Sequence, residues 1–162
     1  MLLADVFLHP GELWFGGDNA RVRTILGSCV AITLWHPRRR IGGMCHYMLP
    51  ESTNRKACAS DGRYAADAIE LLCGKIAHHR TFPGEYEAKL FGGGHMFLPL
   101  KREAGKFPPV PDRNVAAARE LMARHGFRIV AEHLGGHGHR SIIFEVCSGD
   151  VWVRQTPLPE EP

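Results

Sequence analysis

The sequence RVRTILGSCVAITLW, residues 21–35, contains two runs rich in β-branched and aliphatic residues, Arg21–Leu26 and Val30–Trp35. Runs of this kind, bounded by a short glycine-containing segment, are typical of consecutive β-strands. The segment between them is Gly27-Ser28-Cys29, and its glycine lets the backbone bend where the first strand ends. We therefore predict that Cys29 lies in a turn between two strands.

A third strand-like run, Ile41–Leu49, contains His46, seventeen residues after Cys29. Consecutive antiparallel strands bring residues this far apart side by side. A thiol beside an imidazole is the minimum needed for nucleophilic attack on a carbonyl carbon. We predict Cys29 as the nucleophile and His46 as its base and proton donor, with the thiolate stabilised as an ion pair that lowers the thiol pKa. Cys45 should pack on the opposite face, because side chains alternate along a strand.

Two helices are predicted by apolar residues that recur at steps of three and four, over residues 61–79 and 112–125. Asp112 is expected to cap the second helix, and Gly126 to end it. Together with the strands, these helices predict a mixed α/β fold, in which a largely antiparallel sheet carries two main helices. Additional short strands are expected over residues 13–15, 87–91, 127–134, 141–147 and 151–155.

The chain of 162 residues has the size of one domain and can bury about two-thirds of its unfolded surface. Apolar residues make up 44% of the chain and charged residues 23%, which is typical of a soluble globular protein. We assign residues 1–155 to this single domain. Residues 156–162 are rich in proline and glutamate, which predicts a disordered tail.

Several classes of protein are excluded by the charge and cysteine patterns. The formal net charge is +3, and Arg38-Arg39-Arg40 is the one basic run, so no nucleic-acid-binding face is expected. No apolar run approaches the roughly 18 residues that cross a bilayer, so no membrane insertion is expected. The five cysteines are odd in number and show no Cys-x-x-Cys spacing. This pattern favours reduced thiols in a cytoplasmic protein.

A metal site is the main competing interpretation of the sequence. His133, His137 and His139 have the spacing H-x3-H-x-H, and imidazole binds zinc well, so a metal-dependent hydrolase is an alternative. However, no cysteine or carboxylate completes an obvious tetrahedral set, and two of these histidines flank Gly138 in a predicted hairpin turn. We therefore expect exposed turn histidines, with no metal and no cofactor.

The motifs around the cysteine and the histidine resemble those of a known family. Residues 24–31 (TILGSCVA) and 43–50 (GMCHYMLP) are similar to the signature of CheD, the family of chemoreceptor glutamine deamidases. The resemblance extends over about residues 5–155, nearly the whole chain. Further matching segments are residues 64–69, 89–93, 96–97, 113–115, 135–136, 140–141 and 148–153.

The resemblance implies a cytoplasmic protein-glutamine deamidase that acts on methyl-accepting chemoreceptors in chemotaxis adaptation. In such an enzyme Cys29 attacks the side-chain carboxamide of a receptor glutamine, ammonia leaves, and hydrolysis of the thioester gives glutamate. The family is also associated with hydrolysis of glutamyl methyl esters, and a CheC-type phosphatase is an implied partner. The alternative is a non-catalytic regulatory protein that docks on receptors or on such a phosphatase.

The resemblance also implies supporting residues. The family uses a threonine just upstream of the cysteine, and Thr24 is the candidate here; a structural role in its strand is the alternative. Backbone amides around Ser28 are the nearest candidates to stabilise an oxyanion, because Gly27 lets that backbone bend. The Ser28 hydroxyl is a candidate substrate contact. Gly92 and Gly93 lack a phosphate-loop pattern, so we expect a turn or a close approach to substrate near the active site.

Overall fold

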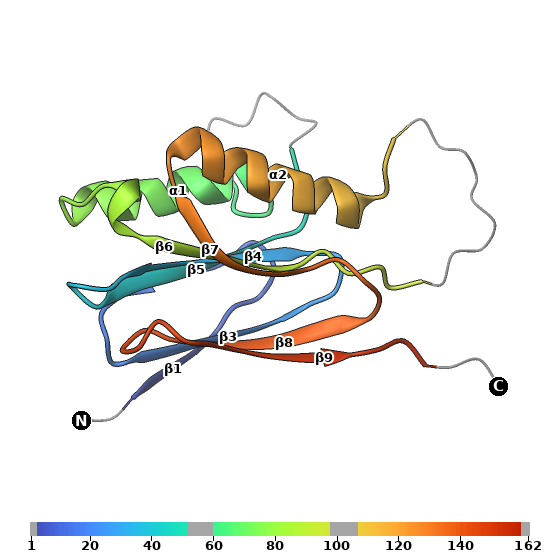
Figure 1. Cartoon of the computed structure of the whole chain (residues 1–162), viewed down its shortest axis with the longest axis horizontal. Coiled ribbons are helices and arrows are strands. Elements are labelled where there is room, and N and C mark those ends of the chain that lie inside the picture. Colours follow the sequence, from blue (N-terminus) through green and yellow to red (C-terminus); the bar gives the residue numbers. More distant parts are fainter. Residues whose placement is uncertain (1–2, 52–59, 98–106, 160–162) are drawn as a thin grey trace.

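The computed structural model describes residues 3–51, 60–97 and 107–159, which form three layers (Figure 1). Two helices form the first layer, and two sheets form the others. The elements are β1 (Ala4–Phe7), β2 (Leu13–Gly16), β3 (Ala20–Leu26), β4 (Val30–His36), β5 (Ile41–Tyr47), α1 (Ala65–His78), the 3-10 turn η1 (Pro83–Glu85), β6 (Glu87–Gly92), α2 (Val110–His125), β7 (Arg128–Leu134), β8 (His139–Glu145) and β9 (Val151–Thr156).

A five-stranded sheet, in the order β2-β5-β4-β6-β7, lies between the helices and a four-stranded sheet in the order β1-β3-β8-β9 (Figure 1). Among the described strands, the β1–β3 and β6–β7 pairs are parallel and the other neighbours are antiparallel. The predicted mixed α/β class, with largely antiparallel strands and two helices, is therefore confirmed. The strands divide between two sheets, where the sequence predicted one.

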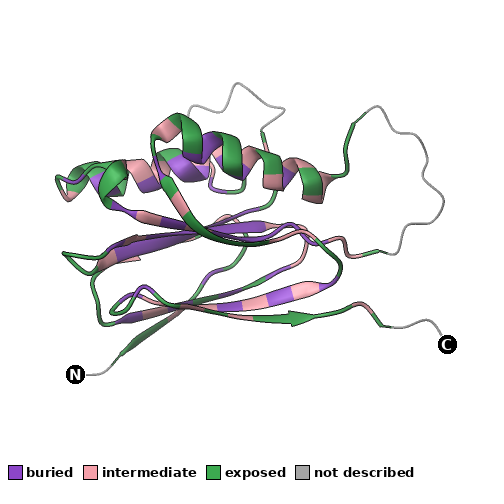
Figure 2. Cartoon of the chain, viewed as in Figure 1, coloured by how far each residue is buried: buried purple, intermediate pink, exposed green. Residues whose placement is uncertain are grey.

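The burial patterns of β3 and β4 explain why the chain builds two sheets. In β3 every second residue is buried, whereas Arg23 and Ile25 on the other face are exposed. In β4 nearly every residue is buried, because one face packs on the helices and the other on the four-stranded sheet (Figure 2). An alternating run suits a strand with one solvated face, and a continuous apolar run suits one covered on both. β4 is thus an inner strand of the molecule.

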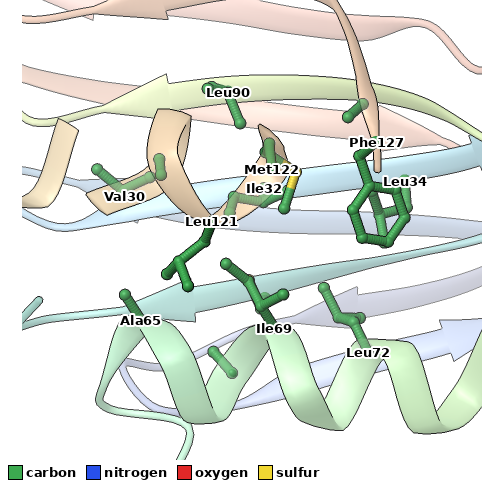
Figure 3. Packing of buried hydrophobic residues seen from close by; sticks show 14 of the residues in the cluster. Val30, Ile32, Leu34, Ala65, Ile69, Leu72, Leu90, Leu121, Met122 and Phe127 are labelled. Carbon is green, nitrogen blue, oxygen red and sulfur yellow. The ribbon is translucent and has the colours of Figure 1, made fainter. Parts of the chain in front are cut away.

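Two apolar clusters set the spacing of the layers. Burial of a leucine or phenylalanine side chain stabilises the fold by roughly 1.5–3 kcal/mol, so these contacts dominate the packing. The cluster between the helices and the five-stranded sheet includes Val30, Ile32, Leu34, Ile69, Leu72, Leu121 and Phe127 (Figure 3). The cluster between the sheets includes Val22, Leu26, Ala31, Met44, Ile142 and Phe144.

Three features of the fold differ from the sequence prediction or extend beyond it. β1 was not predicted, because its four residues have no clear alternation; it pairs with β3. Asp112 does not cap α2, which begins two residues earlier with a proline in its first turn. The predicted tail begins inside β9, whose last residue is Thr156. The end of this tail, residues 160–162, and one of the five cysteines, Cys58, lie outside the described residues.

No helix in the described ranges is long and apolar enough to span a membrane.

Both helices end in the same backbone geometry but with different residues. Arg80 follows α1 with a φ angle of 56°, and Gly126 follows α2 with a φ angle of 80°. In each case the next residue donates its amide hydrogen to the carbonyl five residues before it, as in a Schellman motif. Gly126 confirms the predicted end of the second helix. The left-handed region costs a non-glycine residue roughly 1–2 kcal/mol, so Arg80 destabilises the first end.

We expect Arg80→Gly to stabilise the protein by about 0.5–1 kcal/mol, because the strain removed exceeds the entropy that glycine adds to the unfolded chain. Gly126→Ala should destabilise it by about 1 kcal/mol, and it isolates the backbone effect, since a Cβ at this position meets no atom within 4 Å. Urea unfolding of both variants and the parent measures these changes. Equal stability of the three proteins would contradict the prediction.

Candidate active site

The turn at residues 27–29 carries the chain from the four-stranded sheet to the five-stranded sheet, as predicted from its glycine. A second glycine segment holds this turn from one side. The Gly94 amide donates to the Gly27 carbonyl (2.9 Å), and the Gly93 amide donates to the Cys29 carbonyl (2.8 Å). The backbone around the cysteine is therefore fixed by hydrogen bonds that do not involve its side chain.

Close approach is the reason why this second segment contains glycines. Gly92 has a φ angle of 108°, and a Cβ there would lie 2.2 Å from the Cys29 carbonyl oxygen. Gly93 has a φ angle of 64°, and a Cβ there would lie 2.3 Å from a methyl carbon of Val115. Both predicted glycines thus adjoin the cysteine turn, as a support for its backbone. A contact between them and a substrate stays a prediction.

A buried arginine that sequence reasoning missed holds the glycine segment in turn. Arg140 is 2% exposed, and burial lowers the pKa of its guanidinium. It donates to the carbonyls of Gly92 (3.3 Å) and Gly135 (2.5 Å) and to Nδ1 of His133 (2.8 Å). The surrounding sequence is rich in glycine and histidine and reads as an exposed turn, so nothing in it indicated a buried cation.

His46 lies on the face of β5 that points toward the other sheet. It is paired directly with Ala31 of β4, which belongs to the cluster between the sheets. Cys29 lies two residues before Ala31, just outside the ladder, and packs against the same cluster, so it lies on the same side of the five-stranded sheet as His46. The thiol makes no hydrogen bond with His46 Nε2 in this structure. Cys45 is fully buried in the helix-side cluster, which confirms the predicted strand faces.

Thr24 joins the histidine from the opposite sheet. Its hydroxyl oxygen lies 2.7 Å from Nδ1 of His46, and its hydroxyl donates to the Leu8 carbonyl (2.8 Å). A hydroxyl has one proton, so this oxygen must accept the hydrogen bond from the ring. Nδ1 therefore carries the imidazole proton and Nε2 carries the lone pair. Nε2 is buried and has no hydrogen-bond partner among the described residues.

Burial keeps the pair uncharged. It lowers the pKa of His46 to about 4, with a smaller contribution from the charge of His9. It also raises the pKa of the Cys29 thiol, an effect that the Cys29 backbone amide offsets in part. Desolvation disfavours the charged form of each group, which differs from the ion pair expected from the sequence. A neutral imidazole with a free Nε2 can accept a thiol proton during attack, as in general-base catalysis.

Backbone amides beside the sulfur are available to a developing oxyanion. The amides of Ser28 and Cys29 donate to no other residue in the described part of the chain. The carbonyls of this turn, in contrast, accept hydrogen bonds from the glycine segment and from the Asn114 side chain. Donors fixed in this way stabilise negative charge at little reorganisation cost. The oxyanion role stays a prediction, as does the contact of the Ser28 hydroxyl with substrate.

The remaining histidines have separate positions. His133 accepts the hydrogen bond from the buried guanidinium, and His139 begins β8. His95 lies 2.8 Å from the Asp112 carboxylate, and its ring centroid is 5.8 Å from that of His137. Within the described ranges, no three or more His, Cys, Asp and Glu side chains are grouped so that they could hold a metal ion. The histidine spacing in the sequence therefore does not translate into a cluster of ligands.

Comparisons with known proteins identify relatives along most of the chain. The family model described as CheD chemotactic sensory transduction matches residues 48–155. A protein of Dechloromonas aromatica, named probable chemoreceptor glutamine deamidase CheD 3, is 52% identical over 151 residues, which cover 93% of this chain and 87% of the relative. A Pseudomonas savastanoi pv. phaseolicola protein, named probable chemoreceptor glutamine deamidase CheD, is 49% identical over 96% of this chain and 87% of its own length. A Leptospira interrogans protein, named probable chemoreceptor glutamine deamidase CheD 1, is 37% identical over 93% and 92%.

The hydrogen bonds of Thr24 predict one imidazole tautomer. Nitrogen NMR of the parent should show His46 protonated at Nδ1. Thr24→Val should give a mixture of tautomers and a loss of about 1–3 kcal/mol of stability, because the ring N–H and the Leu8 carbonyl lose a buried partner. Thr24→Ser should restore the single tautomer. A parent ring protonated at Nε2 would contradict the assignment.

The low pKa of His46 predicts acid sensitivity. The folded protein binds fewer protons than the unfolded chain between pH 6.5, the ordinary histidine value, and about pH 4. Stability linked to His46 is thus complete above pH 6.5 and declines as the pH falls through this window, by about 2–3 kcal/mol at pH 4.5. Urea unfolding of the parent and His46→Asn at pH 7 and pH 4.5 measures the difference. The same pH dependence in both proteins would exclude His46 as its source.

Proposed function

The chain belongs to the CheD family, and on this premise we propose that it is a chemoreceptor glutamine deamidase, which converts glutamine side chains of methyl-accepting receptors to glutamate. The observation that carries the proposal is the hydrogen-bond chain from Leu8 through Thr24 to His46, which leaves the Nε2 lone pair free on the side of the five-stranded sheet where Cys29 also packs. A thiol and an oriented, neutral imidazole are the groups that attack on a carboxamide requires.

The first half of the reaction forms a thioester. His46 Nε2 takes the Cys29 proton as the sulfur attacks the carboxamide carbon, and the carbonyl electron pair moves to oxygen. The Ser28 and Cys29 amides stabilise this oxyanion. The imidazolium then gives its proton to the amide nitrogen, the carbon–nitrogen bond breaks and ammonia leaves. Because burial lowers the pKa of His46, its protonated form is a strong acid, which favours this step.

The second half releases glutamate. His46 takes a proton from water as the water oxygen attacks the thioester carbon, and the proton returns to the departing Cys29 sulfur. Thr24 Oγ1 accepts the Nδ1 hydrogen in both the neutral and the charged state of the ring, so the orientation of the imidazole is kept through the cycle. The sum is a glutamine side chain plus water giving a glutamate side chain plus ammonia, without a cofactor. A glutamyl methyl ester enters the same route with methanol as the leaving group.

Deamidation has a direct physical consequence for the receptor. Each event replaces a neutral amide with a carboxylate on a signalling helix, which changes charge repulsion between neighbouring helices and shifts the signalling equilibrium. We place this reaction in the cytoplasm, where the described cysteines, all of them free, remain reduced. A CheC-like phosphatase is the proposed regulatory partner.

The test is incubation of the purified protein with cytoplasmic fragments of chemoreceptors, followed by mass spectrometry of their glutamines and measurement of ammonia. Cys29→Ala should fold normally and lose deamidation by a factor of about 10³ or more, because the nucleophile is missing. Cys45→Ala is the matched control, since this thiol faces the helix-side core, and it should keep most activity.

Two results would contradict the proposal. Deamidation by Cys29→Ala at the parental rate would exclude the cysteine route. Receptor binding by the parent without any change in glutamine mass would favour the alternative, a regulatory protein that docks on receptors or on a phosphatase without catalysis.

A further inference from the structure

Asn114 is a polar side chain inside the apolar core. It is the fifth residue of α2, at the start of the second turn, and is 0% exposed. A buried amide destabilises the fold unless its hydrogen-bonding groups find partners, so its contacts indicate why a polar residue suits this position. Its Oδ1 atom has no partner among the described residues, whereas its Nδ2 atom has two.

Both contacts of the amide nitrogen are with the active site. Nδ2 donates to the Ser28 carbonyl (3.0 Å) and to the Met48 carbonyl (2.8 Å). Ser28 precedes Cys29, and Met48 is two residues beyond His46. The two amide hydrogens diverge by about 120° from one nitrogen, so the two carbonyl oxygens must lie roughly 5 Å apart. One planar group therefore sets the distance between the backbone that carries the thiol and the backbone that carries the imidazole.

The Asn114 amide bridges the two backbone segments at the point where the hydrogen bonds between β4 and β5 end. The β4–β5 ladder ends at the pair Val30 and Tyr47. Beyond it β4 is preceded by the turn to the other sheet, while β5 leads away toward α1, so backbone pairing does not continue. The Asn114 amide bonds to the first free carbonyls beyond this pair and substitutes for the missing ladder. Cys29 lies in the turn next to this end of the ladder.

The position of Asn114 is fixed by β5 as well. The Tyr47 hydroxyl donates to the Asn114 backbone carbonyl (2.5 Å), and Tyr47 is the residue between His46 and Met48. Two consecutive residues of the chain after His46 thus bond to Asn114, Met48 through the asparagine side chain and Tyr47 through its backbone. A rigid attachment of this kind transmits any shift of the helix to the spacing of the site.

We propose that Asn114 is a positioning residue, which holds the Cys29 turn at a fixed distance from His46 without touching the substrate. The inference rests on the proposed catalytic use of Cys29 and His46. It adds a third residue that the reaction requires, and this residue lies in the helical layer of the fold. Removal of the amide leaves the Ser28 and Met48 carbonyls free to separate. Misplacement of reacting groups by about 1 Å lowers a rate by as much as 10²-fold.

The decisive test is a double-mutant cycle on the alkylation of Cys29 by iodoacetamide, read by mass spectrometry of the Cys29 peptide. In the parent background, His46→Asn should slow alkylation near neutral pH by roughly tenfold or more, because the thiol loses its base. In the Asn114→Ala background, the same change should slow it by less than about twofold, because the base is already misplaced. A full tenfold effect in both backgrounds would overturn the proposal.

Deamidation kinetics supply a second readout. Asn114→Ala should lower kcat by about 10²-fold with KM little changed, since the affected groups act in the transition state. Leu121→Ala removes a core side chain from the same helix, and should lower the Tm while kcat stays within about threefold at a temperature well below it. An equal loss of kcat in Leu121→Ala would show that Asn114 affects the rate only through the stability of the fold, which would contradict the proposal. If the parent deamidates no receptor fragment, the proposed function fails, and the alkylation cycle still decides the positioning role.

A third variant allows the test to be made even if Asn114→Ala does not fold. Asn114→Ser keeps one donor, so it can bond one carbonyl but cannot bridge two. If Asn114→Ala does not fold, the cycle is run with Asn114→Ser, which should show the same loss of coupling to His46. Failure of both variants to fold would show that Asn114 serves the fold itself, and would overturn the proposal.

Discussion

The hydrogen bond between Thr24 and His46 joins the two sheets close to the point where the chain crosses between them. Apolar packing sets the separation of the sheets but does not define their relative position, because the hydrophobic effect has no direction. The hydroxyl and the ring meet in one arrangement of β3 against β5, and the Leu8 carbonyl decides which of them donates. The orientation of the imidazole, and the direction in which its free nitrogen points, depend on this contact.

Buried polar side chains gather around the same turn. Thr24, His46, Asn114 and Arg140 are each at most 2% exposed, and they come from four different elements. Each bonds to backbone carbonyls or to another member of the set, and the bonds of Asn114 and Arg140 restrain the cysteine turn and the glycine segment beside it. Buried polar groups destabilise a fold when they lose a partner, so their combined effect is a site with one low-energy arrangement.

The neutrality of the site distinguishes it from one built on a carboxylate. A carboxylate beside Nδ1 stabilises imidazolium and raises its pKa, whereas the Thr24 hydroxyl orients the ring without adding charge. Burial then lowers the pKa of His46 and raises that of Cys29. Both groups are therefore neutral before attack. In the proposed mechanism, the protein thereby gains a strong acid for the departing nitrogen.

The sequence by itself determined the local structure and indicated the two residues that we propose to react. The two runs rich in β-branched and aliphatic residues, 21–26 and 30–35, and the glycine-marked turn between them predicted both strands and the place of Cys29, and strand alternation separated His46 from Cys45. These signals are short-range, because they follow from the period of one strand. The division into two sheets, the charge state of the thiol–imidazole pair, and the roles of Asn114 and Arg140 were decided by the tertiary structure. Burial and hydrogen bonds between segments more than 40 residues apart exist only once the layers have packed, so no local pattern encodes them.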